Sequence, residues 1–393
     1  MFQTLQTLQP DAILRLIAEH KADPRDNKID LGIGVYMTPQ GKTPVMDVVK
    51  EAERRIVETE ETKSYIGIAG NPSFNSAMQA LTFGASATDD RLLTFDGPGG
   101  SGCLRVAAGL ISRAKPDAKV WVGDPTWANH IPLLGGAGLE LHTHPYYDAG
   151  TNSLRIDDIV DALRATDKGD VALLHACCHN PTGMDPTEEE WRQIADVIVE
   201  RELLPFIDMA YQGFAEGLEE DAFIIRHLAE RVPEMIVSNS CSKNFGLYRE
   251  RVGSLSVLCE SPASREVVKS NLNNIVRTIY SMPPDHGAAI VGIILNDETL
   301  NARWRDEVAD MRNRLRGNRK LLQDALANKA PGNVFSHLTR AAGMFTFLGI
   351  TPEQVQALKK DYGIYMVGSS RINVAGITET NVEYLAESVA AVL

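Results

Sequence analysis

The feature that most restricts the fold is an alternation of short apolar runs with longer helical patterns between residues 90 and 260. The apolar runs lie at 92–95, 120–123, 171–175, 203–207, 235–240 and 254–258. Runs of this length, separated by helix-length segments, are typical of βαβ units. Between two of them, Asp185 and Pro186 precede three glutamates, which predicts an N-cap, a proline at the first helical position and a helix over about 186–201. The pattern therefore predicts an α/β fold.

The flanking segments predict a second lobe. A chain of 393 residues exceeds what one hydrophobic core usually organises. Segment 29–36 is strand-like, 300–327 is a long amphipathic helix whose Arg/Glu face is expected in solvent, and the tail mixes short elements. The tail elements are strands near 343–348, 364–367 and 372–375, a helix at 352–361 and a closing helix. We expect a large domain at 45–300 and a smaller, discontinuous α+β domain made of 1–44 and 301–393.

Charge and hydrophobicity exclude several classes of partner. A formal net charge of -13 opposes binding to a phosphate backbone, so nucleic acid is not expected as a partner. No apolar stretch reaches the length of a membrane-spanning helix, and the polar start of the chain lacks the layout of a signal peptide. No membrane partner is therefore predicted, and the cytoplasm is the expected location.

Five cysteines form no C-x-x-C pair, and their odd number fits free thiols in a reducing compartment. Strand alternation could place His175, Cys177 and His179 on one face, as in a zinc site. A fourth ligand at recognisable spacing is missing from the sequence. Packing at the end of a buried strand is the favoured interpretation, and no metal is predicted.

The segment GPGGSG (97–102) follows an apolar strand and precedes a helix expected from about Cys103. It satisfies G-x-G-x-x-G, and Asp124 stands near the position of a ribose-binding carboxylate, so a nicotinamide dehydrogenase is one alternative. The physical basis of the motif is broader, because backbone N–H groups at a helix N-terminus bind any phosphate. A phosphate site is the firmer prediction.

Residues at two further strand ends favour a different cofactor. Asp208 and Tyr211 follow the strand at 203–207, and Lys243 and Arg251 follow the strand at 235–240. Ligands of open α/β sheets bind at this edge. An amine that can form an imine, a carboxylate for a pyridinium nitrogen and a phosphate anchor are what pyridoxal 5'-phosphate requires of a protein.

Three long motifs carry a family resemblance over nearly the whole chain. They are SCSKNFGLYRERVG (240–253), DMAYQG (208–213) and HNPTG (179–183). The chain resembles the class I, fold-type I aminotransferases of the aspartate and aromatic amino acid group. The resemblance implies a large domain with a mostly parallel, seven-stranded sheet, a smaller α+β domain and pyridoxal 5'-phosphate as cofactor.

The resemblance also implies roles around the cofactor ring. Lys243 is the implied Schiff-base lysine, and Asp208 the partner of the pyridine nitrogen. Tyr211 and Asn180 are implied to hydrogen-bond the 3-oxygen, and Trp127 to stack on the ring. The catalytic set implied in this way is Lys243, Asp208 and Tyr211.

The phosphate is implied to lie on Gly100 and Ser101, with Ser240 and Arg251 adding charge-assisted bonds. Tyr65, in KSYIG (63–67), matches a tyrosine that reaches the phosphate from the neighbouring subunit. A homodimer with shared active sites follows from this match.

For the substrates, an amino acid and a 2-oxo acid, the implied binding residues are Gly34, Trp127, Asn180, Arg277 and Arg371. Arg371, in SRINVAG (370–376), matches the arginine that clamps the α-carboxylate. Arg277, in VRTIYS (276–281), matches one that receives a distal carboxylate from the other subunit. His130 and His175 are expected behind Asp208, keeping it ionised.

The substrate range is open between two interpretations. Met37 and Met282 occupy positions where dicarboxylate-restricted members commonly carry lysine and asparagine, which favours aromatic amino acids together with aspartate or glutamate. If both methionines only fill packing gaps, a strict aspartate aminotransferase remains. A β-lyase or decarboxylase could use the same cofactor, and a transcriptional regulator with this fold is disfavoured by the negative charge.

Overall fold

A computed structural model of the chain describes residues 1–8, 12–332 and 335–393. The strands are β1 (Ile29–Asp30), β2 (Leu92–Pro98), β3 (Lys119–Asp124), β4 (Glu140–Pro145), β5 (Tyr147–Asp148), β6 (Ser153–Leu154), β7 (Val171–His175), β8 (Leu204–Met209), β9 (Met235–Ser240), β10 (Val252–Leu258), β11 (Phe345–Phe347), β12 (Ile364–Tyr365) and β13 (Arg371–Asn373).

The α-helices are α1 (Ala12–Ala22), α2 (Asp47–Thr59), α3 (Pro72–Phe83), α4 (Gly99–Ala114), α5 (His130–Gly135), α6 (Ile156–Arg164), α7 (Glu188–Glu200), α8 (Phe223–Ala229), α9 (Pro262–Ile279), α10 (His286–Asn296), α11 (Glu298–Lys329), α12 (His337–Arg340), α13 (Pro352–Tyr362) and α14 (Val382–Val392). Short 3₁₀ helices are η1 (Phe2–Thr4), η2 (Gly84–Thr88), η3 (Glu220–Ala222) and η4 (Val374–Gly376). No helix of the described ranges has the length and hydrophobicity needed to span a bilayer.

The central feature is a seven-stranded sheet in the order β2-β10-β9-β8-β7-β3-β4. Strand β10 is antiparallel to both of its neighbours, and the other pairs are parallel. The predicted α/β fold with a mostly parallel sheet flanked by helices is confirmed. All six apolar runs lie in this sheet. Successive residues of these strands are apolar because helices cover both faces of the sheet, so that neighbouring residues enter two different cores. Phe206, for example, packs in the core beside α4, and Ile207 in the core on the opposite face.

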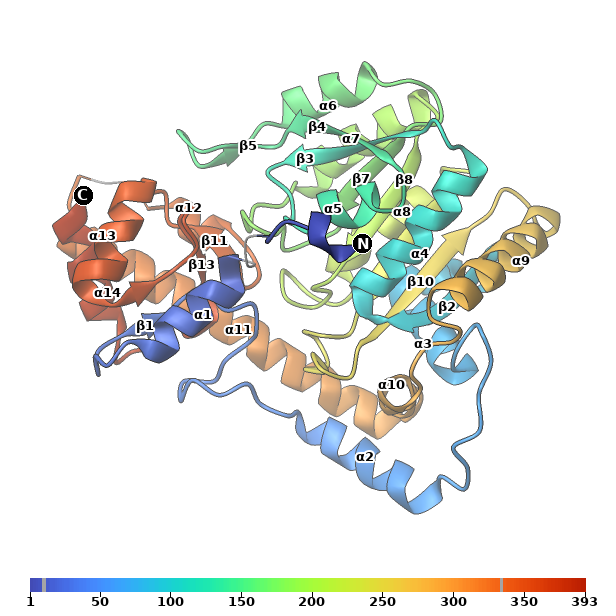
Figure 1. Cartoon of the computed structure of the whole chain (residues 1–393), viewed down its shortest axis with the longest axis horizontal. Coiled ribbons are helices and arrows are strands. Elements are labelled where there is room, and N and C mark those ends of the chain that lie inside the picture. Colours follow the sequence, from blue (N-terminus) through green and yellow to red (C-terminus); the bar gives the residue numbers. More distant parts are fainter. Residues whose placement is uncertain (9–11, 333–334) are drawn as a thin grey trace.

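The N-terminal and C-terminal segments meet at one end of the molecule. Figure 1 shows α1 and β1 beside α13 and α14, with α11 running from there towards α10. Strand β1 pairs with β12 in parallel, and α11 contacts both α10 and α14. The boundaries at 44/45 and 300/301 stay a prediction; the second falls inside the first turn of α11.

Several local predictions were wrong. The N-cap of α7 is Thr187, which forms a capping box with Glu190; the carboxylate of Asp185 instead accepts hydrogen bonds from the backbone N–H groups of Cys178 and His179. Helix α4 begins at Gly99, not near Cys103, and the 372–375 strand is β13 followed by η4. The 29–36 strand is reduced to β1, and β4 was missed.

The basic face of α11 is also not simply solvated. Arg319 is buried, and its guanidinium donates to the carbonyls of Leu338, Ala342, Gly343 and Phe345. An arginine can be buried when most of its donors are used in this way, here those of Nη1 and Nη2; Nε has no partner among the described residues. This residue therefore fixes the turn that leads into β11.

Asp96, on β2, is a buried carboxyl group whose two oxygens have no hydrogen-bond partner among the described residues. Burial raises the pKa of Asp96 to about 8, and the nearby Asp285 acts in the same direction. The backbone N–H groups of Asn71 and Gly97 act against this shift, although their geometry falls short of a hydrogen bond. At pH 7 the folded protein therefore holds a proton that the unfolded chain releases. Between about pH 4 and pH 8 the contribution of Asp96 to stability therefore becomes less favourable as pH rises.

We expect Asp96→Asn to stabilise the protein by on the order of 2 kcal/mol at pH 7, because the neutral amide removes the cost of protonating a buried acid. The gain should grow between pH 6 and pH 8. Urea unfolding of both proteins at these two pH values measures it. An equal difference at both values would contradict the assignment of a raised pKa to this group.

Candidate active site

A cavity of about 260 Å³ lies at the carboxyl edge of the central sheet, where β8 and β9 end and α4 begins. Its walls are formed by Ile13, Gly34, Gly100, Ser101, Leu104, Trp127, His175, Asn180, Asp208, Ala210, Tyr211, Ser240, Ser242, Lys243, Tyr248, Arg251, Phe345 and Arg371. Residues distant in sequence thus converge at the edge where ligands of open α/β sheets bind.

One end of the cavity has the chemistry of an anion site. Gly99 has a positive φ of 73°, and a Cβ placed there would lie 2.5 Å from Nη2 of Arg251; a Cβ on Gly100 would lie 3.1 Å from Cβ of Ser240. Glycine therefore lets the start of α4 approach both side chains closely. Among the described residues, Arg251 hydrogen-bonds only the carbonyl of Tyr248, at 2.9 Å. A helix N-terminus, hydroxyls and an arginine that no carboxylate of the described residues neutralises together fit a phosphate group.

Lys243 projects into the cavity from the loop after β9. Enclosure by protein lowers the pKa of its amine to about 8; the positive charge of Arg251 acts in the same direction, while Asp208 opposes it. The Nζ atom lies 5.0 Å from the centre of the Tyr211 ring. Roughly a tenth of the amine is therefore unprotonated at pH 7, on the order of 300 times more than at its ordinary pKa of 10.5, and this fraction can act as nucleophile or base.

Asp208, at the end of β8, is connected to two buried histidines. Its Oδ2 lies 3.0 Å from Nε2 of His130; the hydroxyl of Thr126 lies 2.9 Å from Nδ1 of His130 and 3.2 Å from Nε2 of His175. Every bond of this network has one donor and one acceptor if Nε2–H of His130 donates to Asp208 and the Thr126 hydroxyl donates to Nδ1 of His130. The Thr126 oxygen then accepts from Nε2–H of His175. His130 thus lies behind Asp208, whereas His175 lines the cavity and is connected to Asp208 only through Thr126 and His130.

The charge of Asp208 depends on this network. Burial is the largest single influence on its pKa and would raise it, but the hydrogen bond from His130 and nearby positive charges, Lys243 among them, together outweigh burial, and the pKa lies below its ordinary value. Burial lowers the pKa of His175 to about 3, so its ring is neutral at physiological pH and contributes no charge there. Among the described residues Oδ1 makes no hydrogen bond, and Asp208 lines the cavity. An ionised oxygen is thus left for a positively charged ring nitrogen.

Arg371 enters from β13 on the opposite side. Its Nη1 donates to Oδ1 of Asn180 at 3.3 Å, its Nη2 donates to the carbonyl of Gly32 at 3.2 Å, and its guanidinium carbon lies 4.4 Å from the centre of the Phe345 ring. The planar cation is therefore held from two sides at the cavity wall. This is the geometry in which arginine recognises a carboxylate.

Backbone strain gathers around the same cavity. Cys178, Arg251 and Ser370 all have positive φ, at 52°, 56° and 65°. Arg251 lines the cavity, Cys178 stands two residues before Asn180, and Ser370 precedes Arg371. Such conformations are unfavourable for residues with a side chain, and they concentrate at functional sites.

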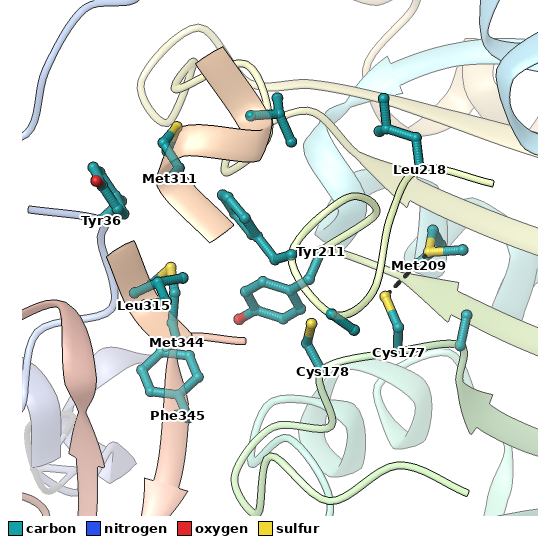
Figure 2. Close-up of a cluster of buried hydrophobic side chains, with 14 of the residues drawn as sticks. Tyr36, Cys177, Cys178, Met209, Tyr211, Leu218, Met311, Leu315, Met344 and Phe345 are labelled. Atoms are coloured by element: carbon teal, nitrogen blue, oxygen red, sulfur yellow. Dashed lines mark hydrogen bonds between the residues drawn. The ribbon is translucent and has the colours of Figure 1, made fainter. Parts of the chain in front are cut away.

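Figure 2 shows Tyr211 packed among Cys178, Met344 and Phe345. The zinc alternative placed His175, Cys177 and His179 on one strand face, but β7 ends at His175 and the chain turns at Cys178. The described group with metal-ligating atoms close together is Cys177, Cys178 and Asp221. Four backbone N–H groups already occupy the Asp221 carboxylate, and burial raises the pKa of the Cys178 thiol to about 11. The group is accordingly interpreted as packing.

Most of the residues implied by the resemblance line the cavity. Three do not: His130 lies behind Asp208, while Tyr65 and Arg277 are exposed at the surface of this chain. Sequence reasoning missed the cavity residues Ile13, Leu104, Ala210, Ser242, Tyr248 and Phe345. Ser242 and Tyr248 lie inside the Lys243 motif and could have been found there; the apolar residues carry no such signal. Asp124, proposed for a ribose, is exposed and outside the cavity.

Comparison with known proteins identifies the family. Residues 26–389 match the family model "Aminotransferase class I and II". The chain is 44% identical to the aromatic-amino-acid aminotransferase of Paracoccus denitrificans (99% of both chains) and 44% identical to the aspartate aminotransferase of Escherichia coli (100% of both). A crystal structure of an aromatic-amino-acid aminotransferase from Burkholderia pseudomallei, covalently bound to pyridoxal phosphate, superimposes with a TM-score of 0.97 at 39% identity over 100% of this chain and 99% of that one. The chain therefore belongs to the class I and II aminotransferases.

Proposed function

We propose that the protein is a pyridoxal-phosphate-dependent aminotransferase that moves the amino group of an aromatic amino acid or aspartate to 2-oxoglutarate. The observation that carries this proposal is one cavity with three parts: an amine with a pKa of about 8, an ionised carboxylate, and an anion site at a helix N-terminus. The relatives include enzymes named for both substrate classes. A strict aspartate aminotransferase is the alternative.

The cavity residues divide into those that hold the phosphate and those that hold the ring. Gly100, Ser101, Ser240 and Arg251 form the phosphate end, since they supply backbone N–H groups, hydroxyls and a cation. Asp208, Tyr211, Asn180 and Trp127 surround the ring, and Lys243 carries the covalent bond. When bound, the cofactor supplies an electron-withdrawing ring that accepts negative charge from the substrate's α-carbon.

The proton transfers fall to Lys243. With the cofactor bound, the amino group of the substrate would replace the Lys243 amine on it, and that amine would then be free inside the cavity. With its pKa lowered to about 8, it can accept the proton from Cα and deliver it to the adjacent carbon of the cofactor. Asp208 meanwhile holds a proton at the ring nitrogen, and Arg371 fixes the α-carboxylate so that Cα faces the amine.

We also propose a cytoplasmic homodimer. Tyr65 is 90% exposed and Arg277 is exposed, so neither completes the cavity of its own chain. Both are expected to enter the site of the partner subunit. Ile66 and Ile279 are exposed hydrophobic residues on the same two segments, as an interface requires. Five buried free thiols suit a reducing compartment.

Met37 and Met282 do not form the cavity wall that would receive an aromatic ring. A Cβ on Gly376 would lie 3.3 Å from Cε of Met37, which packs against the core. Acceptance of an aromatic ring rests instead on the apolar cavity wall formed by Ile13, Trp127 and Phe345. Arg277 stays as the group for a distal carboxylate.

Initial rates with phenylalanine, tyrosine and aspartate against 2-oxoglutarate test the proposal. We expect kcat/KM values within about 100-fold of one another, or about 2.8 kcal/mol. A larger advantage for aspartate would favour the strict aspartate aminotransferase. The purified protein should show a visible absorption band that bleaches when an amino donor is added. Release of the matching 2-oxo acid, with no loss of carbon, separates transamination from decarboxylation and β-elimination.

A further inference from the structure

A segment at residues 31–37, here called the strap, crosses one wall of the cavity. It follows β1 and lines the cavity through Gly34. Although the sequence suggested a strand here, only Leu31, at the start of the strap, bonds to the backbone of strands: its N–H donates to the carbonyl of Tyr365 in β12, and its C=O accepts from the N–H of Asn373 in β13. Side chains from three other parts of the chain hold its backbone instead.

Asn373, at the end of β13 and two residues after Arg371, makes the most contacts to the strap. It is fully buried; its Nδ2 donates to the carbonyls of Ile33 and Val35, both at 2.7 Å. Its backbone N–H donates to the carbonyl of Leu31 at 2.7 Å, and its Oδ1 accepts from the N–H of Ala375 at 3.0 Å. All hydrogen-bonding atoms of the side chain are thus used, and both side-chain donors go to the two residues that flank Gly34.

The far end of the strap is held by other elements. The backbone N–H of Tyr36 donates to the Tyr248 hydroxyl at 2.8 Å, and Arg314 of α11 donates to the carbonyl of Met37 at 2.8 Å. Tyr248 belongs to the same loop as Lys243 and also lines the cavity. The strap is therefore fixed to the Arg371 side by Asn373 and to the Lys243 loop by Tyr248.

Gly34 is the residue that this arrangement leaves open. Among the described residues its N–H and C=O make no hydrogen bond, and a Cβ placed on it would meet nothing within 4 Å. Its φ is not in the left-handed region, so glycine is not needed for the backbone conformation. The carbonyls of both neighbours are engaged, whereas the N–H of Gly34 stays available at the cavity wall.

We infer that Asn373 is a positioning residue: by holding the carbonyls of Ile33 and Val35, it fixes the Gly34 peptide beside Arg371, where it binds the substrate's α-carboxylate. This inference rests on the proposed function for the identity of the ligand. Binding of a carboxylate oxygen to a fixed backbone N–H costs little conformational entropy, because the donor is already ordered before the substrate docks. Asn373 touches neither substrate nor cofactor in this scheme and acts through the strap.

Asn373→Ser tests the inference, since serine cannot reach both carbonyls. Two dissociation constants are measured with the cofactor-loaded enzyme: that of phenylalanine in the single-turnover half-reaction, and that of 3-phenylpropionate by titration calorimetry. Both should rise about 10-fold, while the rate of the half-reaction falls less than about 3-fold. Asn301→Ser is the matched control, because it removes a side-chain bond to the carbonyl of Leu295 away from the cavity. It should lower the melting temperature without changing either constant.

Tyr248→Phe provides a second, gentler variant in case Asn373→Ser does not fold. It removes only the hydroxyl that accepts from Tyr36, and both dissociation constants should rise in the same direction. Unchanged constants in a folded Asn373→Ser variant, or in Tyr248→Phe if that alone folds, would overturn the inference. Because 3-phenylpropionate binding requires no turnover, a failure of the proposed transamination appears separately, as a wild-type enzyme that does not convert phenylalanine.

Discussion

Lys243→Ala is expected to reduce transamination by about 10⁴-fold or more, since it removes both the covalent attachment and the general base. The protein should still fold and bind the cofactor noncovalently. The amine is enclosed and has a pKa lowered to about 8, so its removal relieves desolvation and leaves Asp208 with its hydrogen bond to His130. Steady-state rates and the absorbance retained after dialysis measure the two effects.

Lys243→Arg is the informative companion. Arginine keeps the positive charge and much of the length, but its guanidinium stays protonated and cannot act as nucleophile or base. It should be as inactive as Lys243→Ala. More than trace turnover in either variant would remove Lys243 from the mechanism. A surface substitution such as Lys269→Ala should leave activity unchanged.

The sheet was predictable where its strands are buried on both faces. Residues 171–175 and 235–240 were predicted with the bounds of β7 and β9, because every position in such a strand must be apolar or satisfied. Strand β4 (Glu140–Pro145) was missed because it lies at the sheet edge and mixes exposed residues with partly buried ones and a single buried residue. A strand with mixed polarity gives a weak signal in a single sequence.

Elements set by tertiary contacts were predicted poorly. Asp185 and Thr187 both satisfy the local rule for an N-cap, and the choice between them depends on Cys178 and His179, whose N–H groups require the Asp185 carboxylate. The strap was taken for a strand because extended, apolar residues look alike in both cases. Only the side chains of Asn373 and Tyr248 reveal that its hydrogen bonds go elsewhere.

The candidate site was predictable as far as motifs reach. Lys243, Asp208, Asn180 and Arg371 stand in long motifs and meet in one cavity. Ile13 and Phe345 come from α1 and β11, where nothing in an apolar residue distinguishes a cavity wall from a core. The pKa of about 8 for Lys243 was predictable in direction, from burial and Arg251, because both residues share one loop.

Asp208→Ala is expected to lower kcat by about 10³-fold or more, because no other described carboxylate lines the cavity to hold a proton at the ring nitrogen. Stability should change far less. Loss of the carboxylate leaves the N–H of His130 unpaired in a buried position, which costs about 1–3 kcal/mol. Rates and urea unfolding of the same preparation compare the two losses, and near-normal turnover would refute the role of Asp208.

Asp208→Asn separates charge from shape. The amide oxygen can still accept from Nε2 of His130, so the loss of stability should stay below about 1 kcal/mol. Its NH₂ group, however, donates towards the ring nitrogen instead of accepting, and this favours the unprotonated ring. We therefore expect a loss of kcat close to that of Asp208→Ala. Activity of Asp208→Asn close to that of the wild type would mean that the hydrogen bond to His130 matters more than the negative charge. The lowered pKa of Asp208 would then be a by-product of packing rather than part of the mechanism.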